Sequence, residues 1–249
     1  MKILFTICGR AGSKGIKNKN IRMFLEKPLP LYTLSAIDLY LQKHERDTAD
    51  IALNTDSPEL IQIMENNSMR PVATVKRKEE LAGDTASKID VIQDTYREMK
   101  KRNQYDYDMV VDLDLTSPLR TAADVANVIQ KKRESECDTV FTVADARRNP
   151  YFNMVKKGEC GYERVIASEY VARQQAPEIF DMNASIYAYN PAFLMSGKGI
   201  FEGHCEISKM MDTGILDLDH ENDFELMQVI AKYLFENQEQ FAEIYDNIK

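Results

Sequence analysis

Glycines and cations are interleaved in one stretch near the N-terminus, residues 9–20. Glycine can adopt positive φ and let the backbone approach a ligand closely, and exposed N–H groups in such a turn form a concave anion site. Arg10, Lys14 and Lys19 add full positive charges along the stretch. The spacing fits neither the Walker A pattern nor the dinucleotide pattern Gly-x-Gly-x-x-Gly. A solvated basic face would explain scattered lysines, but the interleaved glycines favour a site for the phosphates of a nucleoside triphosphate.

Two aspartate pairs have the spacing Asp-x-Asp: Asp112 with Asp114, and Asp217 with Asp219. On a strand, residues two apart face the same side, so such a pair presents two carboxylates together. Hard oxygen ligands of this kind suit Mg²⁺, which completes its coordination with water and substrate phosphates. For the later pair, a solvated acidic turn is the alternative, because acidic residues continue to Asp223 and could favour the start of a helix.

The composition is that of an ordinary folded protein, with 249 residues, 44% hydrophobic and 29% charged. This length suits one α/β domain with a modest insertion, so we expect a single domain over residues 1–249. The formal net charge of −8 disfavours nucleic acid or an anionic membrane as the partner. The sequence contains no run of about 18 apolar residues, so no membrane span is predicted. The four cysteines show no Cys-x-x-Cys spacing, which argues against a zinc site and favours reduced thiols in the cytoplasm.

Strand and helix patterns alternate along the chain. Strands are expected at residues 3–8, 50–54, 71–75, 108–115, 138–143 and 214–219. Helices are expected at residues 29–42, 58–66, 85–102, 124–133 and 222–235. Repeated strand–helix units predict a mostly parallel sheet with helices on both faces, which is an α/β fold. Ligands of such sheets bind at the carboxyl ends of the strands, where the glycine-rich loop is expected.

The rhythm changes between about residues 149 and 188 to short β-like pieces and polar turns. We expect a small β-rich insertion here that packs against a second subunit, giving a homodimer. The aromatic pair Tyr151 and Phe152 fits either this interface or core packing.

Four ordered motifs resemble those of the CMP-sialic acid synthetases, or acylneuraminate cytidylyltransferases. Arg10-Ala11-Gly12-Ser13-Lys14-Gly15, followed by Lys19-Asn20, is similar to the family's N-terminal signature. Residues 77–87 resemble its second motif, Thr116-Ser117-Pro118-Leu119-Arg120 its third, and Asp217-Leu218-Asp219 its late metal pair. The resemblance spans nearly the whole chain and implies a Rossmann-like nucleotidyltransferase sheet with a β-rich dimerisation insertion.

The resemblance also implies an activity, in which CTP is joined to a nine-carbon sugar acid and pyrophosphate is released. The implied catalytic residues are Arg10, Lys14 and Lys19, in the loop around the phosphates. The implied nucleotide-binding residues are Ala11, Gly12, Ser13, Asn20, Arg77, Ala86 and Ser87. Asp217 and Asp219 are the implied ligands of Mg²⁺. No general base is predicted, because the histidines fit surface or capping positions better than catalytic ones: His44, His204 and His220.

A sugar acid of this class carries a carboxylate beside its anomeric carbon, and the planar fork of arginine suits that group. The segment from Arg173 resembles the family's Arg-Gln-x-x-Pro, and residues 181–187 align with a later motif in which Asp181 replaces an arginine and Ala184 a glycine. A glutamine usually lies where Asp114 stands, so we expect Asp114 to touch the sugar. The expected sugar-binding residues are Asp114, Thr116, Ser117, Arg120, Arg173, Gln174, Asn183 and Tyr187.

Together with residues 147–153, these segments look most like bacterial CMP-legionaminic acid synthetases, with N-acetylneuraminic acid as the other expected substrate. Two other functions stay open. A metal-dependent nucleotide-sugar glycosyltransferase would hold its metal with Asp112 and Asp114, although it need not grip a triphosphate at its first strand. A non-catalytic nucleotide-binding relative is disfavoured, because the loop cations and the late aspartates are all present.

Overall fold

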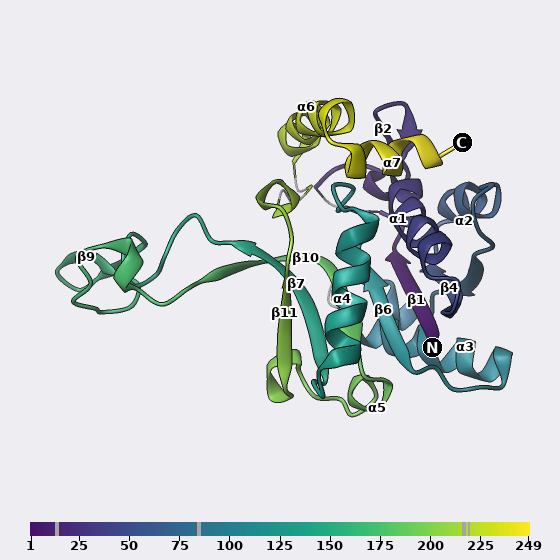
Figure 1. Ribbon diagram of the computed structural model, residues 1–249, viewed down its shortest axis with the longest axis horizontal. Helices are drawn as coiled ribbons and strands as arrows, with labels where there is room; N and C mark the ends of the chain where they lie inside the picture. Colours follow the sequence, from purple (N-terminus) through teal and green to yellow (C-terminus); the bar gives the residue numbers. More distant parts are fainter. Residues whose placement is uncertain (13–14, 84–85, 216–217, 219) are drawn as a thin grey trace.

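The computed structural model describes residues 1–12, 15–83, 86–215, 218 and 220–249. Within these residues, the centre is a seven-stranded sheet in the order β11-β7-β10-β6-β1-β4-β5 (Figure 1). Neighbouring strands run parallel, except that β10 runs antiparallel to β6 and β7. The predicted mostly parallel α/β sheet is therefore confirmed. The strands are β1 Lys2–Gly9, β4 Thr48–Thr55, β5 Ala73–Lys76, β6 Met109–Leu113, β7 Thr139–Asp145, β10 Phe180–Tyr189 and β11 Cys205–Lys209.

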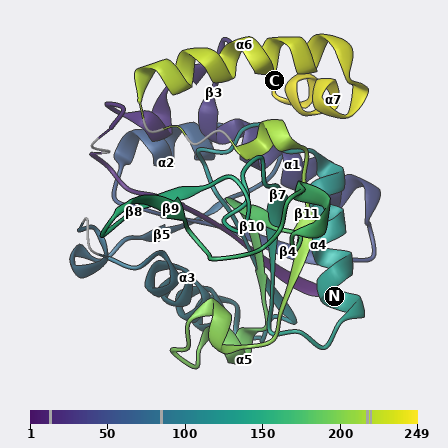
Figure 2. The ribbon, with the colours of Figure 1, turned by 90° about the vertical axis from the view of Figure 1, so that its left-hand side faces the viewer.

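Helices cover both faces of the sheet, because the side chains of its buried strands alternate between two apolar clusters. Along β1, Ile3, Phe5 and Ile7 face one cluster and Leu4 faces the other. The first face carries α1 (Leu29–Lys43), α2 (Pro58–Glu65), α4 (Ala122–Glu134), α6 (Glu221–Asn237) and α7 (Glu239–Asn247), as Figure 2 shows. The second face carries α3 (Lys88–Asn103) and the short α5 (Pro191–Leu194). Helix α1 is buried along most of its length because α4 and α7 pack over it.

Two helices begin where a side chain caps them. At the start of α2, Leu60 N donates to Ser57 Oγ at 3.2 Å. At the start of α4, Asp124 N donates to Thr121 Oγ1 at 3.1 Å, and Thr121 N donates to Asp124 Oδ2 at 2.8 Å. Caps of this kind stabilise a helix by about 1 kcal/mol. They fix where the helices start, and with them the loops that join the helices to the sheet edge.

Several expected boundaries are wrong. Residues 214 and 215, expected to begin a strand, belong to a 3-10 helix, η5 (Asp212–Ile215), and residues 216, 217 and 219 of that expected strand lie outside the described residues. Within the described residues, β11 is the last strand of the sheet along the chain. The C-terminal helical region is two helices, because the backbone turns to an extended conformation at Gln238 between α6 and α7. Helix α3 begins at Lys88 rather than at residue 85, because Ser87 is extended (φ −68°, ψ 134°).

An arm projects from the body between β7 and β10 (Figure 1). It contains a hairpin of β8 (Val155–Gly158) and β9 (Gly161–Arg164) and a 3-10 turn, η3 (Arg173–Gln175). Residues 180–188, expected within the insertion, belong instead to β10 in the central sheet. The arm therefore ends where β10 enters the sheet, nine residues before the expected boundary at 188.

Short elements complete the described chain: β2 (Met23–Phe24), β3 (Lys27–Pro28), η1 (Lys19–Ile21), η2 (Glu79–Leu81) and η4 (Ile200–Glu202). None of the described helices has both the length and the apolar character needed to cross a membrane.

Candidate active site

The carboxyl ends of β1, β4, β5 and β6 meet at one edge of the sheet. Strand β1 has β4 on one side and β6 on the other, so the chain order reverses between β1 and β6. Open α/β sheets bind ligands in the crevice that such a reversal leaves at the carboxyl ends of the strands. The glycine-rich loop follows β1, Arg77 follows β5, and Asp112 and Asp114 lie at the end of β6. The fold therefore brings these predicted residues to one edge.

Steric crowding fixes the start of the glycine-rich loop. A Cβ atom on Gly9 would lie 2.5 Å from Leu115 Cδ1 and 2.7 Å from Leu60 Cδ2, so a larger residue would clash there. Gly12 has a φ of +70°, in the left-handed region that favours glycine. Ile16 is fully buried and ties the far side of the loop to the core. Steric crowding at Gly9 and the positive φ of Gly12 thus explain why glycine occupies these two positions.

Hydrogen bonds hold the loop around a small hollow. Ala11 N donates to Asp56 Oδ1 at 2.8 Å, and Asn20 Nδ2 donates to Arg10 O at 3.0 Å. Arg10, Ala11, Gly12 and Asn20 line a cavity of about 200 Å³. One residue predicted for catalysis, Arg10, and three predicted for nucleotide binding therefore surround one space at the end of β1.

The late acidic segment lies against this loop. Lys19 Nζ donates to the backbone oxygen of Leu218 at 2.7 Å, although the two residues are far apart in the sequence. A second link joins Arg22 to the start of α6, where Nη1 lies 2.5 Å from Glu221 Oε2. Asp217 and Asp219 flank Leu218 but lie outside the described residues, as do Ser13 and Lys14 of the loop.

Arg77 is held rigidly beneath the site. Its side chain is buried, and its Nε and Nη2 donate to Oδ1 and to the backbone oxygen of Asn54, each at 3.0 Å. Burial lowers the pKa of Arg77 and the nearby Arg10 acts in the same direction, while Asp56 opposes them. Of the other residues predicted for the nucleotide, Ala86 is half-buried and Ser87 is exposed, directly before α3. Both precede Lys88, whose ammonium contacts the aspartates at the end of β6.

Lys88, the first residue of α3, bridges the two aspartates at the end of β6. Its Nζ lies 2.9 Å from Asp112 Oδ2 and 2.8 Å from Asp114 Oδ2. Burial alone would raise the pKa of Asp114, but Lys88 and hydrogen bonds from Thr116 outweigh it and hold that pKa well below its usual range. Burial opposes the charge of Lys88, yet the two aspartates raise its pKa well above the usual range. Asp114 and Lys88 therefore stay charged around neutral pH.

The motif after β6 folds back onto Asp114. Thr116 donates to Asp114 Oδ1 from its backbone N at 2.8 Å and from its Oγ1 at 2.6 Å. Ser117 Oγ donates to Ser185 Oγ at 2.8 Å on the neighbouring β10. Tyr187, also on β10, has its ring centroid 6.0 Å from Lys88 Nζ. Asp114, Thr116 and Tyr187 therefore lie together in the crevice.

Two residues expected to bind the sugar, Arg120 and Asn183, are buried and hydrogen-bonded to other protein groups. The side chain of Arg120 is 0% exposed, and it donates to Ser185 Oγ at 3.1 Å, to Thr33 Oγ1 at 3.2 Å and to Asp114 O. Burial lowers the pKa of Arg120 to about 10. Asn183 is 4% exposed and its Oδ1 accepts from Thr142 Oγ1 at 2.6 Å. In this structure both side chains hold the β6 loop and β10 in place, and contact of either with the sugar stays a prediction.

Arg173 and Gln174 lie at the base of the arm, on the β7 side of the sheet. They line a cavity of about 490 Å³ with Asn149, Phe180 and Lys209. The guanidinium of Arg173 donates to the backbone oxygen of Ala146, just after β7. The structure therefore places these two residues at the base of the arm and away from the glycine-rich loop, which follows β1.

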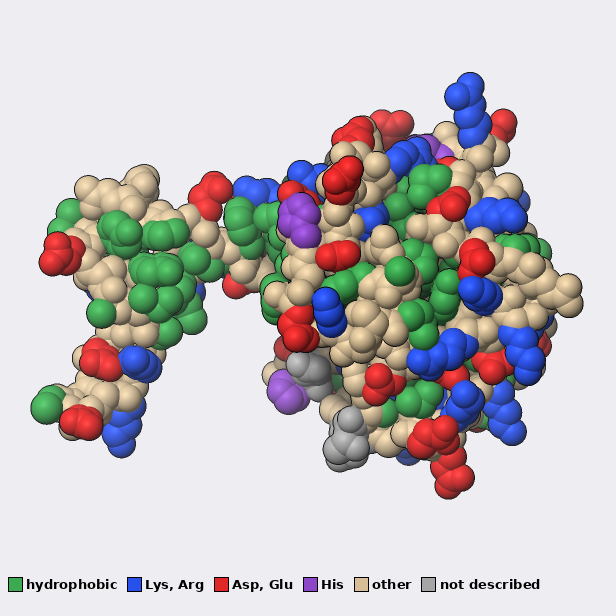
Figure 3. Space-filling model, turned by 90° about the horizontal axis from the view of Figure 1, so that it is seen from below, with side chains coloured by type: hydrophobic (Ala, Val, Ile, Leu, Met, Phe, Trp, Pro, Cys, Tyr) green, Lys and Arg blue, Asp and Glu red, His purple; other side chains and the backbone are tan. Residues whose placement is uncertain are grey.

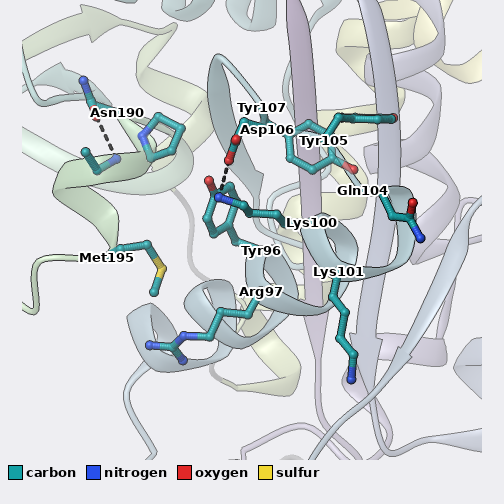
Figure 4. A pocket seen from close by; sticks show the side chains of 12 residues that line it. Tyr96, Arg97, Lys100, Lys101, Gln104, Tyr105, Asp106, Tyr107, Asn190 and Met195 are labelled. Atoms are coloured by element: carbon teal, nitrogen blue, oxygen red, sulfur yellow. Dashed lines mark hydrogen bonds and ion pairs between the residues drawn. The ribbon is translucent and has the colours of Figure 1, made fainter.

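A larger hollow, of about 970 Å³, lies at the opposite end of the sheet (Figure 4). Tyr96, Arg97 and Lys100 of α3 face it together with Tyr107, which precedes β6. Its lining contains none of the residues predicted for nucleotide, sugar or metal. Lys100 pairs with Asp106 across it, and the hydroxyl of Tyr107 donates to Asp50 Oδ2 at 2.7 Å, so these polar groups already have partners. The candidate site stays at the carboxyl edge.

Two site residues were missed from the sequence: Lys88 and Asp56. Lys88 directly follows the Ala86-Ser87 motif and precedes an apolar helical pattern, so its position at the start of a helix offered a signal. The sequence signal for Asp56 is weaker: this residue directly follows β4, one of the strands whose carboxyl ends form the site. Among the described residues, no group of three or more His, Cys, Asp or Glu side chains is placed to hold a metal ion.

Comparisons with known proteins by family model, by sequence and by structure give similar results. A family model described as cytidylyltransferase matches residues 4–247. The post-translational flagellin modification protein B of Campylobacter coli is 33% identical over 234 residues, 93% of this chain and 95% of that protein. The CMP-N,N'-diacetyllegionaminic acid synthase of Campylobacter jejuni is 32% identical over 233 residues, 92% and 94% of the two chains. A solved CMP:2-keto-3-deoxy-manno-octonic acid synthetase complexed with CTP has a TM-score of 0.66 at 14% identity, over 94% of this chain and 99% of that one, which shows a shared fold.

Proposed function

Because the chain belongs to the cytidylyltransferase family, we propose that it activates a nonulosonic acid with CTP and releases pyrophosphate. One observation carries the proposal: Lys19 of the glycine-rich loop bonds to Leu218, which draws the late acidic segment against a cationic loop at the end of β1. The cations of this loop and the pair Asp217 and Asp219 have the chemistry that suits the phosphates and the metal of a nucleotidyl transfer. The relative named as a legionaminic acid synthase supports the sugar class.

The reaction is attack of the anomeric hydroxyl of the sugar acid on the α-phosphorus of CTP, with pyrophosphate as the leaving group. Such a transfer depends on in-line positioning and on stabilising phosphate charge more than on covalent catalysis. Arg10 and Lys14 would bind the phosphates, and backbone N–H groups of the loop would donate to the oxygens that gain charge. Lys19 would hold the loop and the acidic segment together while it faces the same phosphates. Arg77, fixed by Asn54, would support the cytidine.

Mg²⁺ would be held by Asp217 and Asp219. Leu218, the described residue between them, supports this assignment, because its backbone oxygen lies 2.7 Å from Nζ of Lys19 in the glycine-rich loop. When bound there, Mg²⁺ supplies neutralisation of phosphate charge and fixes the geometry of the triphosphate. We expect Asp217→Asn to weaken the response to Mg²⁺ and to lower turnover steeply.

The sugar acid would bind over the end of β6, where Asp114, Thr116 and Tyr187 face the crevice. The ionised carboxylate of Asp114 can accept hydrogen bonds from sugar hydroxyl or amide groups, and it stands where related enzymes usually have a glutamine. N,N'-diacetyllegionaminic acid is the proposed substrate, with N-acetylneuraminic acid as the second. Arg173 and Gln174 stay a prediction for the sugar carboxylate.

We also propose that the chain forms a homodimer through its arm. Large apolar side chains are exposed there, and Figure 3 shows hydrophobic atoms gathered along it. Among them, Val155 is 65%, Tyr162 79% and Val171 82% exposed. An exposed apolar patch on a projecting arm is typical of an interface between subunits. The free cysteines fit a reducing compartment, so we place the enzyme in the cytoplasm.

A nucleotide-sugar glycosyltransferase is the second candidate, and Asp112 with Asp114 is the observation that favours it. The ammonium of Lys88 between their carboxylates counts against it, because that position would have to hold the metal. The test incubates the protein with CTP, ATP, GTP or UTP and a panel of sugar acids, with and without Mg²⁺. Pyrophosphate is measured and the product is identified by mass spectrometry. We expect a CMP-sugar from N,N'-diacetyllegionaminic acid with CTP and Mg²⁺ only. Equal turnover with GTP, or transfer from a preformed nucleotide sugar, would exclude the proposal.

A further inference from the structure

The carboxylates of Asp112 and Asp114 converge on one ammonium group. Each has one oxygen fixed by the scaffold: Thr6 Oγ1 donates to Asp112 Oδ1 at 2.8 Å, and Thr116 donates twice to Asp114 Oδ1. The other oxygen of each carboxylate lies within 2.9 Å of Lys88 Nζ. Two fixed carboxylates with free oxygens aimed at one point form the kind of arrangement that holds a divalent cation in many proteins. Here the cation at that point is a side chain.

The contact with Asp112 is electrostatic. Its Oδ2 is buried and accepts no hydrogen bond from the described residues, although Lys88 Nζ is only 2.9 Å away. The side chain of Asp112 is 0% exposed, so solvent does not screen the charge. A buried carboxylate without a counter-charge is strongly unfavourable, and Lys88 is the cation that compensates it.

Helix stability alone does not explain a lysine at this position. Lys88 is the first residue of α3, and a positive charge is unfavourable at a helix N-terminus because the helix dipole is positive there. The side chain is also 37% exposed and so could turn to solvent, yet its ammonium contacts both aspartates. The two carboxylates therefore determine where the charge of Lys88 lies.

We propose that Lys88 is a built-in cation, which occupies the place of a divalent metal between Asp112 and Asp114 and keeps this pair metal-free. A metal bound there together with the ammonium would face strong charge repulsion at very short range. Lys88 is thus a positioning residue that holds Asp114 ionised and oriented toward the sugar side of the crevice. It also leaves the late aspartates as the metal site. The sugar role rests on the proposed function, whereas the exclusion of metal does not.

The experiment measures Mn²⁺ binding to the full-length protein without nucleotide, by electron paramagnetic resonance. Lys88→Met keeps the length of the side chain and removes its charge, and it should bind Mn²⁺ at one more site per chain than the wild type. Lys88→Arg keeps a charge and should gain none, and the double variant Lys88→Met with Asp114→Asn should lose the gain. Lys78→Met is the matched control, because Lys78 pairs with the single buried carboxylate of Asp94 at 2.5 Å. It should gain no site.

Two results would overturn the proposal. One is a folded Lys88→Met protein, judged by circular dichroism, with the same number of Mn²⁺ sites as the wild type. The other is loss of a wild-type Mn²⁺ site in Asp114→Asn, since the pair would then bind metal despite Lys88. The second comparison does not need Lys88→Met to fold. Because no turnover is measured, failure here is distinct from failure to make a CMP-sugar.

Discussion

Arg10 and Lys17 belong to the same glycine-rich loop, but only Arg10 lines the hollow at the end of β1. Arg10→Ala should lower turnover on the order of 10²–10³-fold, the usual effect of removing one preorganised electrostatic donor from a transition state. Its melting temperature should match the wild type, because the side chain lies outside the core. Lys17 is exposed in the same loop, so Lys17→Ala should keep nearly full turnover. Steady-state kinetics with both variants tests this, and wild-type turnover in Arg10→Ala would mean that the loop is merely a solvated basic face.

For Arg120 we expect the opposite result, a loss of stability. Lysine cannot reproduce its fork of donors to Ser185, Thr33 and the Asp114 carbonyl, so Arg120→Lys leaves buried acceptors without partners. We expect a loss of ~2 kcal/mol in the free energy of unfolding and a drop of roughly 4–8 °C in Tm. Arg97→Lys, at an exposed position on α3, should change Tm very little. An unchanged Tm in Arg120→Lys would contradict this structural role, and a raised KM for the sugar acid would support the predicted sugar contact.

The depressed pKa of Asp114 has a consequence for acid stability. Because the folded state binds its proton less readily than the unfolded state, the ionised carboxylate stabilises the fold above the ordinary aspartate pKa of about 3.9. That contribution declines as the pH falls below this value toward the folded pKa. Urea unfolding should therefore show a gap between wild type and Asp114→Asn that is constant above about pH 5 and shrinks below about pH 4. A gap that stays constant to pH 3 would contradict the assigned ion pair.

For single residues, the sequence identified side chains that belong to a recognisable motif, and it missed side chains whose role depends on a contact in the folded structure. Arg10 and Lys19 stand out because glycines and a strand surround them. Lys88 is one lysine among many in an acidic protein, and only the packing of α3 against β6 brings it to the two aspartates. The burial of Arg120 could not be predicted either, because the sequence Ser-Pro-Leu-Arg does not indicate whether its arginine faces solvent or the core.

At the scale of elements, the strongly periodic and fully buried segments were predictable and the edge segments were not. Strands β1 and β6 are mostly apolar, and every residue of β6 is buried. Strand β11 lies at the sheet edge with a single buried residue, so its sequence carries little strand signal. The start of β10 was assigned to the insertion for a related reason: four of its first five residues lie outside the core, and its strand character comes from pairing with β7.

The arm is the element whose role is easiest to test. Tyr162→Asp and Val171→Asp place charges on its most exposed apolar positions and should convert a dimer to a monomer at micromolar concentration in sedimentation velocity. Val229→Asp is the matched control, because Val229 is 68% exposed on α6, away from the arm, and should leave the dimer intact. A wild-type monomer, or a dimer that survives both arm variants, would contradict this assignment.

At the scale of the whole molecule, an acidic chain concentrates cations at one edge of its sheet. The formal net charge is −8, yet Arg10, Lys19, Arg77 and Lys88 all lie at the carboxyl ends of β1, β4, β5 and β6. The acidic remainder disfavours polyanions as partners, while the local cations attract a small anionic ligand. This division of charge was partly predictable from the sequence, because two of the four cations, Arg10 and Lys19, fall within the first strand–loop unit.

In the proposed reaction, the anomeric hydroxyl of a nonulosonic acid attacks the α-phosphorus of CTP. A sugar acid labelled with ¹⁸O at its anomeric hydroxyl, followed by mass spectrometry of the products, tests this step. We expect the label to stay in the CMP-sugar, in the oxygen that bridges sugar and phosphorus, and pyrophosphate to carry none. Loss of the label from the CMP-sugar would show that the bond to the anomeric carbon breaks, as in glycosyl transfer, and would exclude attack by the hydroxyl on phosphorus.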